Sequence, residues 1–317
     1  MAIKYLTSKE VVGRLLYALA TAQQLSWIGE IAPTPFSSNS AKELYAALGM
    51  VPAMKEWIDG RRLQKLDDKA FEVINKIFEA ALQVSIDDLR RDKTGQLMLR
   101  IGELAKRGTS HWAKLVSNLI NSGENETCYD GKYFFAKNHS HNKSGTQVNI
   151  IEPDISALTL PATAHGSVTA PAPEEMAACI LAAIQQLLGL KDDQGEPVNE
   201  GANKFQVQVP ISLMNAAYGA VKPAVFANNG TNIIPVSDFQ INVVPNPRLT
   251  FTNKFVVFRT DSEIKPVLLQ EEYGIKTSAL AEGSDREILN REHIYTIDTS
   301  RQVAPWAWYM ACLVDMK

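Results

Sequence analysis

The sequence predicts an α+β fold, because helical patterns gather in the first two thirds of the chain and strand patterns in the last third. The clearest helical spacing of apolar residues covers residues 94–121. The clearest period-two alternation covers residues 205–209 and 239–243. Hydrophobic residues make up 45% of the 317 residues and charged residues 21%, which is the composition of a globular chain with a sizeable core.

The N-terminal segment predicts two small helices joined by a Pro- and Ser-rich strap. The first covers residues 7–25 and begins at a capping box formed by Thr7 and Glu10. The second covers residues 41–48, with Ser40 in the same capping role. Neither helix has a large core nearby in sequence, so we expect an arm that packs on another surface.

Residues 54–84 predict a long β-hairpin with its turn near Asp67. An ordinary surface hairpin is one interpretation. An isolated two-stranded hairpin is only marginally stable in water, however. Because this one carries Trp57, Phe71 and Phe78, we expect it to require a partner surface.

Residues 94–121 predict the longest helix, a rod of roughly 40 Å. Gly102 and Gly108 each cost about 1 kcal/mol relative to Ala, so tertiary packing must stabilise it. The apolar stripe that we expect to pack consists of Leu97, Ile101, Leu104, Trp112, Leu115 and Leu119.

The second half begins with a helix at 173–188, where Pro173 occupies the first turn and apolar residues occupy most faces. Residues 303–314 are apolar on both faces, as in a covered central strand. Further strands are predicted at 205–209, 239–243, 254–258, 265–270 and 292–298.

Catalytic and metal-binding motifs are weak in this chain. His139 and His141 would share one face of a strand, and with Cys128 and Asp130 they suggest a zinc site or a metal-dependent hydrolase. No second CxxC or HxxxH pair supports that site, and no P-loop, GxGxxG or GxSxG motif occurs. We therefore expect neither an enzyme nor a cofactor.

Charge and hydropathy narrow the function classes further. The longest uncharged apolar runs, 176–184 and 303–314, are shorter than a membrane-spanning helix requires, and the N-terminus lacks the pattern of a signal peptide. The three cysteines predict free thiols rather than disulfides. With 32 basic and 35 acidic residues the net charge is −3, which disfavours a broad basic face that grips nucleic acid.

Several motifs carry a family resemblance: LYAALG (44–49), PAMKEWIDGR (52–61), NKIFEA (75–80), VSIDD (84–88) and CYDG (128–131). In this order they resemble the major head (capsid) subunit of phage Mu and Mu-like prophages. Weaker similarities continue through 193–197, 246–249 and 306–308. The resemblance is most specific between about residues 40 and 140.

That resemblance implies the Hong Kong 97-type fold of tailed-phage shells. The fold has an N-terminal arm, an extended hairpin (the E-loop), a peripheral domain with a long spine helix, and an axial domain. In this chain we expect the arm at 1–53, the E-loop at 54–84, the peripheral domain at 85–154 and 262–300 with its spine helix at about 94–121, and the axial domain at 155–261 and 301–317.

The implied function is that of a major capsid protein of a tailed double-stranded DNA phage or prophage. Such subunits assemble through pentamers and hexamers into an icosahedral head. The implied partners are the chain itself, a scaffolding protein, a portal, decoration proteins, and DNA held by enclosure. The implied location is the virion, after assembly in the cytoplasm of the host bacterium. A net charge of −3 suits a shell inside which DNA must move during packaging and ejection.

Two groups of residues are the expected sites. The E-loop contacts with a neighbouring subunit would be made by Trp57, Arg61, Arg62, Lys65, Asp67, Asp68, Phe71, Ile74, Ile77 and Phe78. The loops at the centre of a capsomer would contain Asp192, Asp193, Asn228, Asn229 and Gly230. A nanocompartment shell protein of the same fold is the alternative, followed by a soluble hydrolase that uses Asp130, His139 and His141.

Overall fold

The computed structural model contains two principal β-sheets, each with its own hydrophobic core and its own covering helices. Residues 54–69 of the expected E-loop lie outside the described part of the chain. The structure describes residues 7–21, 25–46, 70–91, 95–140, 144–158, 165–192, 195–223, 225–226, 231–232 and 234–317.

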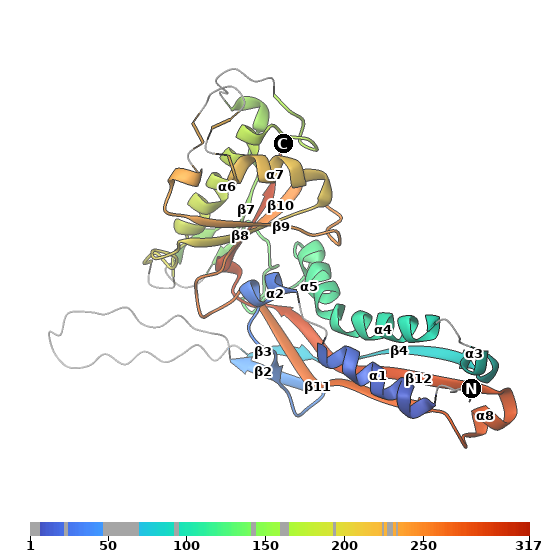
Figure 1. Ribbon diagram of the computed structural model, residues 1–317. Helices are drawn as coiled ribbons and strands as arrows, with labels where there is room; N and C mark the ends of the chain where they lie inside the picture. The colour runs from blue at the N-terminus through green and yellow to red at the C-terminus, as the bar shows by residue number, and fades with distance from the viewer. Residues whose placement is uncertain are drawn as a thin grey trace, which may run out of the picture.

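A four-stranded sheet forms the elongated part of the molecule (Figure 1). Its strand order is β1-β11-β12-β4, and β12 pairs antiparallel with both of its neighbours. Helix α8 (Asp285–Asn290) lies between β11 and β12 in the sequence, and α3 (Ile86–Arg91) follows β4. The strands are β1 (Phe36–Ser37), β4 (Lys76–Ser85), β11 (Val267–Leu280) and β12 (Glu292–Pro305).

Helices α1 (Ser8–Thr21) and α4 (Gln96–Thr109) pack on this sheet. Alternate residues of β12, such as Tyr295 and Ile297, face the helices because side chains alternate along a strand. Leu15 of α1 is buried in the same cluster. The predicted first helix is therefore confirmed, and it packs along α4 of its own chain.

A five-stranded sheet forms the rounder part of the molecule, with the order β7-β13-β10-β8-β9. Helices α6 (Pro173–Leu188) and α7 (Met214–Val221) pack against it (Figure 1). The strands are β7 (Ile150–Ile151), β8 (Lys204–Val209), β9 (Gln240–Pro245), β10 (Lys254–Arg259) and β13 (Ala311–Asp315).

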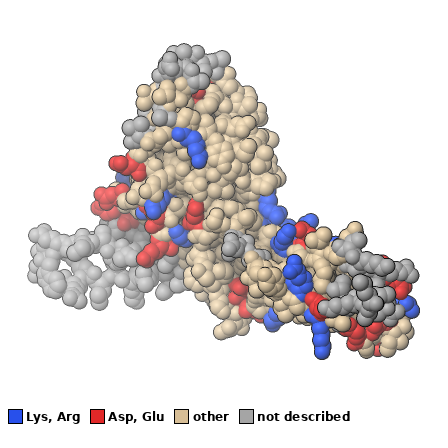
Figure 2. Space-filling view, in the orientation of Figure 1, with Lys and Arg blue, Asp and Glu red and all other residues tan. Residues whose placement is uncertain are grey.

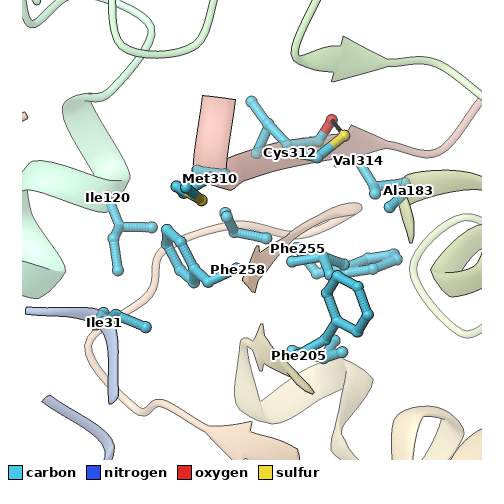
Figure 3. Packing of buried hydrophobic residues seen from close by; sticks show 14 of the residues in the cluster. Ile31, Ile120, Ala183, Phe205, Phe255, Phe258, Met310, Cys312 and Val314 are labelled. Atoms are coloured by element: carbon cyan, nitrogen blue, oxygen red, sulfur yellow. Dashed lines mark hydrogen bonds between the residues drawn. The ribbon is translucent and has the colours of Figure 1, made fainter. Parts of the chain in front are cut away.

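The core of this part joins segments that are far apart in the sequence. Figure 3 shows Phe205 and Phe255 from the sheet packed near Ala183 of α6. Ile120 and Ile31 approach the same core from α5 (His111–Ser122) and α2 (Ser26–Ile31). The strands predicted at 205–209, 239–243 and 254–258 and the helix at 173–188 are confirmed.

The helix predicted at 41–48 is wrong, because residues 42–46 form strand β2 (Lys42–Ala46), which pairs antiparallel with β3 (Ala70–Ile74). The Glu43 carboxylate accepts hydrogen bonds from the Ser38 and Ser40 hydroxyls and thereby closes a turn. The same Ser and Glu residues that resemble a helical capping box therefore stabilise a different local structure.

The helix predicted at 94–121 is two helices, since α4 ends at Thr109 and α5 begins at His111. Leu97 and Ile101 enter the smaller core, with Leu104 partly buried beside them, whereas Trp112 and Leu119 enter the larger core, with Leu115 partly buried there. Near the break, a Cβ atom on Gly108 would lie 3.0 Å from the Cδ1 atoms of Ile275 and Ile297. The break allows each half of the apolar stripe to follow its own sheet.

The single strand predicted at 303–314 is also wrong. β12 ends at Pro305 in the four-stranded sheet, and β13 begins at Ala311 in the five-stranded sheet. A 3₁₀ turn at Trp308–Met310 connects the two. The whole segment is apolar on both faces because it is mostly buried, and most of it lies in the larger core. The strands predicted at 265–270 and 292–298 are confirmed as parts of β11 and β12.

Candidate interaction surfaces

Ile74 and Ile77 lie exposed on either side of the bend between β3 and β4. Their exposed fractions are 56% and 72%. Asn75 holds the bend, since its Nδ2 donates to the Ser40 carbonyl at 3.0 Å and its Oδ1 accepts from Gln270 Nε2 at 2.9 Å. The two isoleucines therefore project from a well-anchored base, as a contact surface for another molecule requires.

Leu44 belongs to the same exposed surface, although sequence analysis assigned it to a helix. It is 65% exposed and pairs with Glu72 across the β2–β3 ladder, in which Ile74 pairs with Lys42. Directly opposite residues share one face of a sheet, so these four side chains lie together. We call Leu44, Ile74 and Ile77 the hairpin-base surface.

Phe71 and Phe78 contact their own chain instead. Phe71 packs on a small core formed by Val73, Leu268 and Ala304. The Phe78 ring lies 4.4 Å from the His111 ring, measured between centroids. The remaining expected E-loop contacts, Trp57, Arg61, Arg62, Lys65, Asp67 and Asp68, lie outside the described residues.

Asp192 is the described member of the expected capsomer-centre loops; Asp193, Asn228, Asn229 and Gly230 lie outside the described residues. Its side chain folds its own loop, because Oδ1 accepts from the Glu196 N–H at 2.9 Å. The backbone supports the same tight turn, with the Asp192 N–H donating to the Glu196 carbonyl at 2.7 Å. The structure thus gives Asp192 a local role in shaping the loop.

The candidate zinc ligands form a structural pair. His139 is fully buried, its Nδ1–H donates to Asp130 Oδ2 at 2.6 Å, and its ring stacks on Trp308 with centroids 4.0 Å apart. Burial raises the pKa of the Cys128 thiol, so that thiol is a poor nucleophile. His141 lies outside the described residues, and within them no cluster of three or more His, Cys, Asp or Glu side chains suits a metal ion.

The Asp130–His139 pair makes stability depend on pH. Burial raises the pKa of Asp130, but the hydrogen bond and charge of His139 outweigh it and leave the pKa below 3.8, the ordinary value. Because its pKa is lowered, the Asp130 carboxylate stabilises the folded chain at pH values above 3.8. This stabilisation is lost as the pH falls through the folded-state pKa. We expect Asp130→Asn to show a flatter loss of stability below pH 4 than the unsubstituted chain, measured by urea unfolding. Asp238→Asn, at an exposed site, is the control; parallel curves for all three proteins would contradict the assignment.

Buried asparagines were missed by sequence analysis. Asn149 Oδ1 accepts from the Ala136 N–H at 2.8 Å, and its Nδ2 donates to the carbonyls of Phe134 and Trp308 at 2.7 and 3.2 Å. Asn199 Nδ2 donates to the carbonyls of Leu187 and Tyr309, both at 2.8 Å. These contacts have no sequence period, so pattern reasoning offers no signal for them.

Arg301 lies at the junction of the two parts and is almost completely buried. Its guanidinium carbon lies 4.6 Å from the centre of the Trp112 ring, and its Nε donates to Thr299 Oγ1 at 2.9 Å. Burial lowers the pKa of Arg301, although the negative charge of Glu271 opposes the effect. Since Trp112 is in the first turn of α5, this contact ties β12 to the helix that enters the larger core.

Within the described residues, the helices are too short or too polar to cross a bilayer.

Comparison with known proteins places the sequence resemblance in the first half of the chain. Residues 14–159 match the family model of the Mu-like prophage major head subunit gpT. The chain is 30% identical over 125 residues to the major capsid protein of Escherichia phage Mu, and 32% identical over 110 residues to the Mu-like prophage FluMu major head subunit of Haemophilus influenzae. These alignments cover 37% and 35% of the chain, which spans 41% and 35% of the two relatives. The predicted resemblance is thereby confirmed.

Structural similarity extends over almost the whole chain. The subunit of the bacteriophage JBD30 procapsid matches with a TM-score of 0.55 and 18% identity, covering 98% of this chain and 74% of that one. The chain therefore has the Hong Kong 97-type fold of phage capsid proteins, and the predicted α+β class is confirmed.

Proposed function

We propose that this chain is the major capsid protein of a tailed double-stranded DNA phage or prophage, a structural protein rather than an enzyme. One observation carries the proposal: a capsid-subunit fold covers 98% of the chain, and its first half carries the sequence of Mu-like head subunits. The subunits would form pentamers and hexamers and then an icosahedral head within the virion. Heterologous contacts that close into rings, and rings that close into a shell, supply the mechanism.

The domain assignment is part of this proposal. Two separate cores support a division into two bodies, one on each principal sheet. We assign the N-terminal arm to 1–53, the E-loop to 54–84, the peripheral domain to 85–154 and 262–300, and the axial domain to 155–261 and 301–317.

Scaffolding, portal and decoration proteins are the proposed partners, and assembly would take place in the cytoplasm of the host bacterium. The DNA would be enclosed rather than gripped. A net charge of −3 supports this, because a strongly cationic lining would bind phosphates through counterion release and resist packaging.

The hairpin-base surface is the proposed contact with the adjacent subunit. Leu44, Ile74 and Ile77 are exposed on a base that Asn75 holds in place, so burying them on a neighbour needs little reorganisation. Apolar burial contributes about 25 cal/mol per Å². The ion pair between Lys42 and Glu72 beside them, at 3.1 Å, is exposed and is expected to contribute about 0–1 kcal/mol.

Substitution of Ile77 tests both the surface and the function. Negative-stain microscopy and sedimentation of the purified protein should show capsomers or shells. We expect Ile77→Asp to lose them while its circular dichroism and thermal midpoint stay unchanged, since the side chain is 72% exposed. Phe71→Asp is a poorer test because Phe71 packs within its own chain.

The matched control is Gln83→Asp, an exposed polar position on the same strand, which should assemble normally. Normal shells from Ile77→Asp would refute the contact but leave the capsid assignment intact. A protein that remains monomeric at all concentrations and in crowding agents would contradict the capsid assignment. Empty shells that never package DNA in phage-producing cells would favour a nanocompartment instead.

A further inference from the structure

A pocket of about 240 Å³ opens where α4 meets α5. Its apolar lining comes from the sheet below, mainly Phe78 of β4, Ile275 of β11 and Ile297 of β12. Gly108 completes this lining, and the absence of a side chain there brings the helix close to the two isoleucines. The pocket is large enough for a small polar group carried on a short carbon stem.

Three cations line this pocket, and each comes from a different element. Arg107 is in the last turn of α4, Lys114 is in α5, and Arg248 is in the loop between β9 and β10. None of them makes a salt bridge with any other described residue. Glu103, one turn before Arg107, pairs with Lys106 at 2.7 Å instead. Figure 2 shows Lys and Arg side chains on the face that carries α4 and α5.

Two carboxylates, Glu79 and Asp298, line the same pocket. Burial and then the negative charge of Asp298, which lies close to the Tyr273 hydroxyl, raise the pKa of that tyrosine. The buried Arg301 adds further positive charge, since its field reaches His111 at the pocket wall. The cationic groups therefore outnumber the anionic ones around this cavity.

His111 supplies an unsatisfied group at the same place. Its Nδ1 atom is buried and has no hydrogen-bond partner among the residues that the structure describes. Burial, followed by the positive charges of Arg301, Lys114 and Arg248, lowers the pKa of His111 to about 4. A buried polar nitrogen without a partner costs free energy, which an acceptor oxygen in the pocket would recover.

We propose that this pocket binds an oxyanion, a carboxylate or a phosphate group, between Arg107, Lys114 and Arg248, with its carbon stem over the apolar lining. Cationic side chains that converge on one oxyanion form short, charge-assisted hydrogen bonds. The two sources of that chemistry are a carboxylate on an aliphatic stem and a phosphate. This inference goes beyond the proposed capsid function and does not rest on it.

Thermal unfolding of the full chain tests the site, with sodium glutarate and sodium phosphate as probes at pH 7 and constant ionic strength set with sodium chloride. Binding to the folded state stabilises it by RT ln(1 + [L]/Kd), so we expect a midpoint that begins to rise near Kd and then increases with the logarithm of the probe concentration. A larger rise with glutarate would identify a carboxylate on a stem, and a larger rise with phosphate would identify a phosphate group.

Arg248→Gln and Lys114→Gln should each weaken the apparent affinity about tenfold. The matched control, Lys9→Gln in α1, removes an exposed cation away from the pocket and should respond like the unsubstituted chain. An equal midpoint shift in Arg248→Gln and in the unsubstituted chain would reveal a general salt effect and overturn the proposal. The absence of a midpoint rise with the logarithm of the concentration of either probe would overturn it as well.

Discussion

Asn149→Leu is expected to destabilise the chain by about 3–5 kcal/mol, because it leaves two buried backbone groups without partners at about 1–3 kcal/mol each and removes a third hydrogen bond. The Ala136 N–H would lose its acceptor and the Phe134 carbonyl its donor, whereas the Trp308 carbonyl would keep only the Ala311 N–H. Such a loss is a large part of the 5–15 kcal/mol typical of folded domains. Urea unfolding followed by circular dichroism measures it from the shift of the midpoint.

The matched control is Asn118→Leu, an exposed position on α5, which should change stability by no more than about 0.5 kcal/mol. A loss below 1 kcal/mol for Asn149→Leu would mean that water replaces the amide. The site is fully buried and the Leu side chain would fill it, so we expect no such replacement.

Asn149 also shows where sequence reasoning ends. Helical and strand periods predicted α1, α6, β8, β9 and β10, because one buried face imposes a regular spacing on the chain. The side chain of Asn149 joins residues 13, 15 and 159 positions away, and no period encodes such distances. Local chemistry likewise misled the assignment of 41–48, since Glu43 closes a turn with Ser38 rather than capping a helix.

The residues of the candidate surfaces could also be predicted only in part from the sequence. Ile74 and Ile77 were identified from apolar bulk in a segment without a local core, and the structure places both in solvent. Leu44 was missed because its segment was assigned to the wrong element. The three cations of the pocket could not be predicted from the sequence, for another reason. Arg107 and Lys114 look like the solvated face of a helix, and only folding brings Arg248 beside them.

Arg301→Ala is expected to destabilise the chain by about 3 kcal/mol or more. The substitution removes the hydrogen bond to Thr299 and the stacking on Trp112, and it leaves a cavity where a long side chain was buried. Arg301→Lys keeps the charge but loses the planar stacking, so it should cost less, about 1–2 kcal/mol. Urea unfolding of both variants gives the comparison; equal losses would show that the charge retained by Lys contributes nothing and that the contacts of the guanidinium group carry the role of Arg301.

A double-mutant cycle isolates the ring contact. Arg301→Met, which removes the charge at a similar length, and Trp112→Leu, made singly and together, should show a coupling of about 1–2 kcal/mol, the range of a desolvated cation–π pair. A coupling near zero would place the stabilisation in the Thr299 hydrogen bond and in packing.

The position of Arg301 gives its loss a second consequence. The contact joins β12, which belongs to the four-stranded sheet, to α5, which packs in the larger core. Val267 and Leu269 of β11 and Val303 of β12 also reach the larger core, but the core between the four-stranded sheet and its helices is the smaller one. A domain unfolds in one cooperative step only while its parts stabilise one another. We therefore expect Arg301→Ala to split the unfolding transition, with the part on the four-stranded sheet unfolding first because it buries fewer apolar side chains. Hydrogen exchange would show this as early loss of protection in β4 and β12 while β8 and β10 remain protected; a single, uniformly shifted transition would show that the other contacts between the two parts, such as that of Phe78 with His111, are enough to couple them.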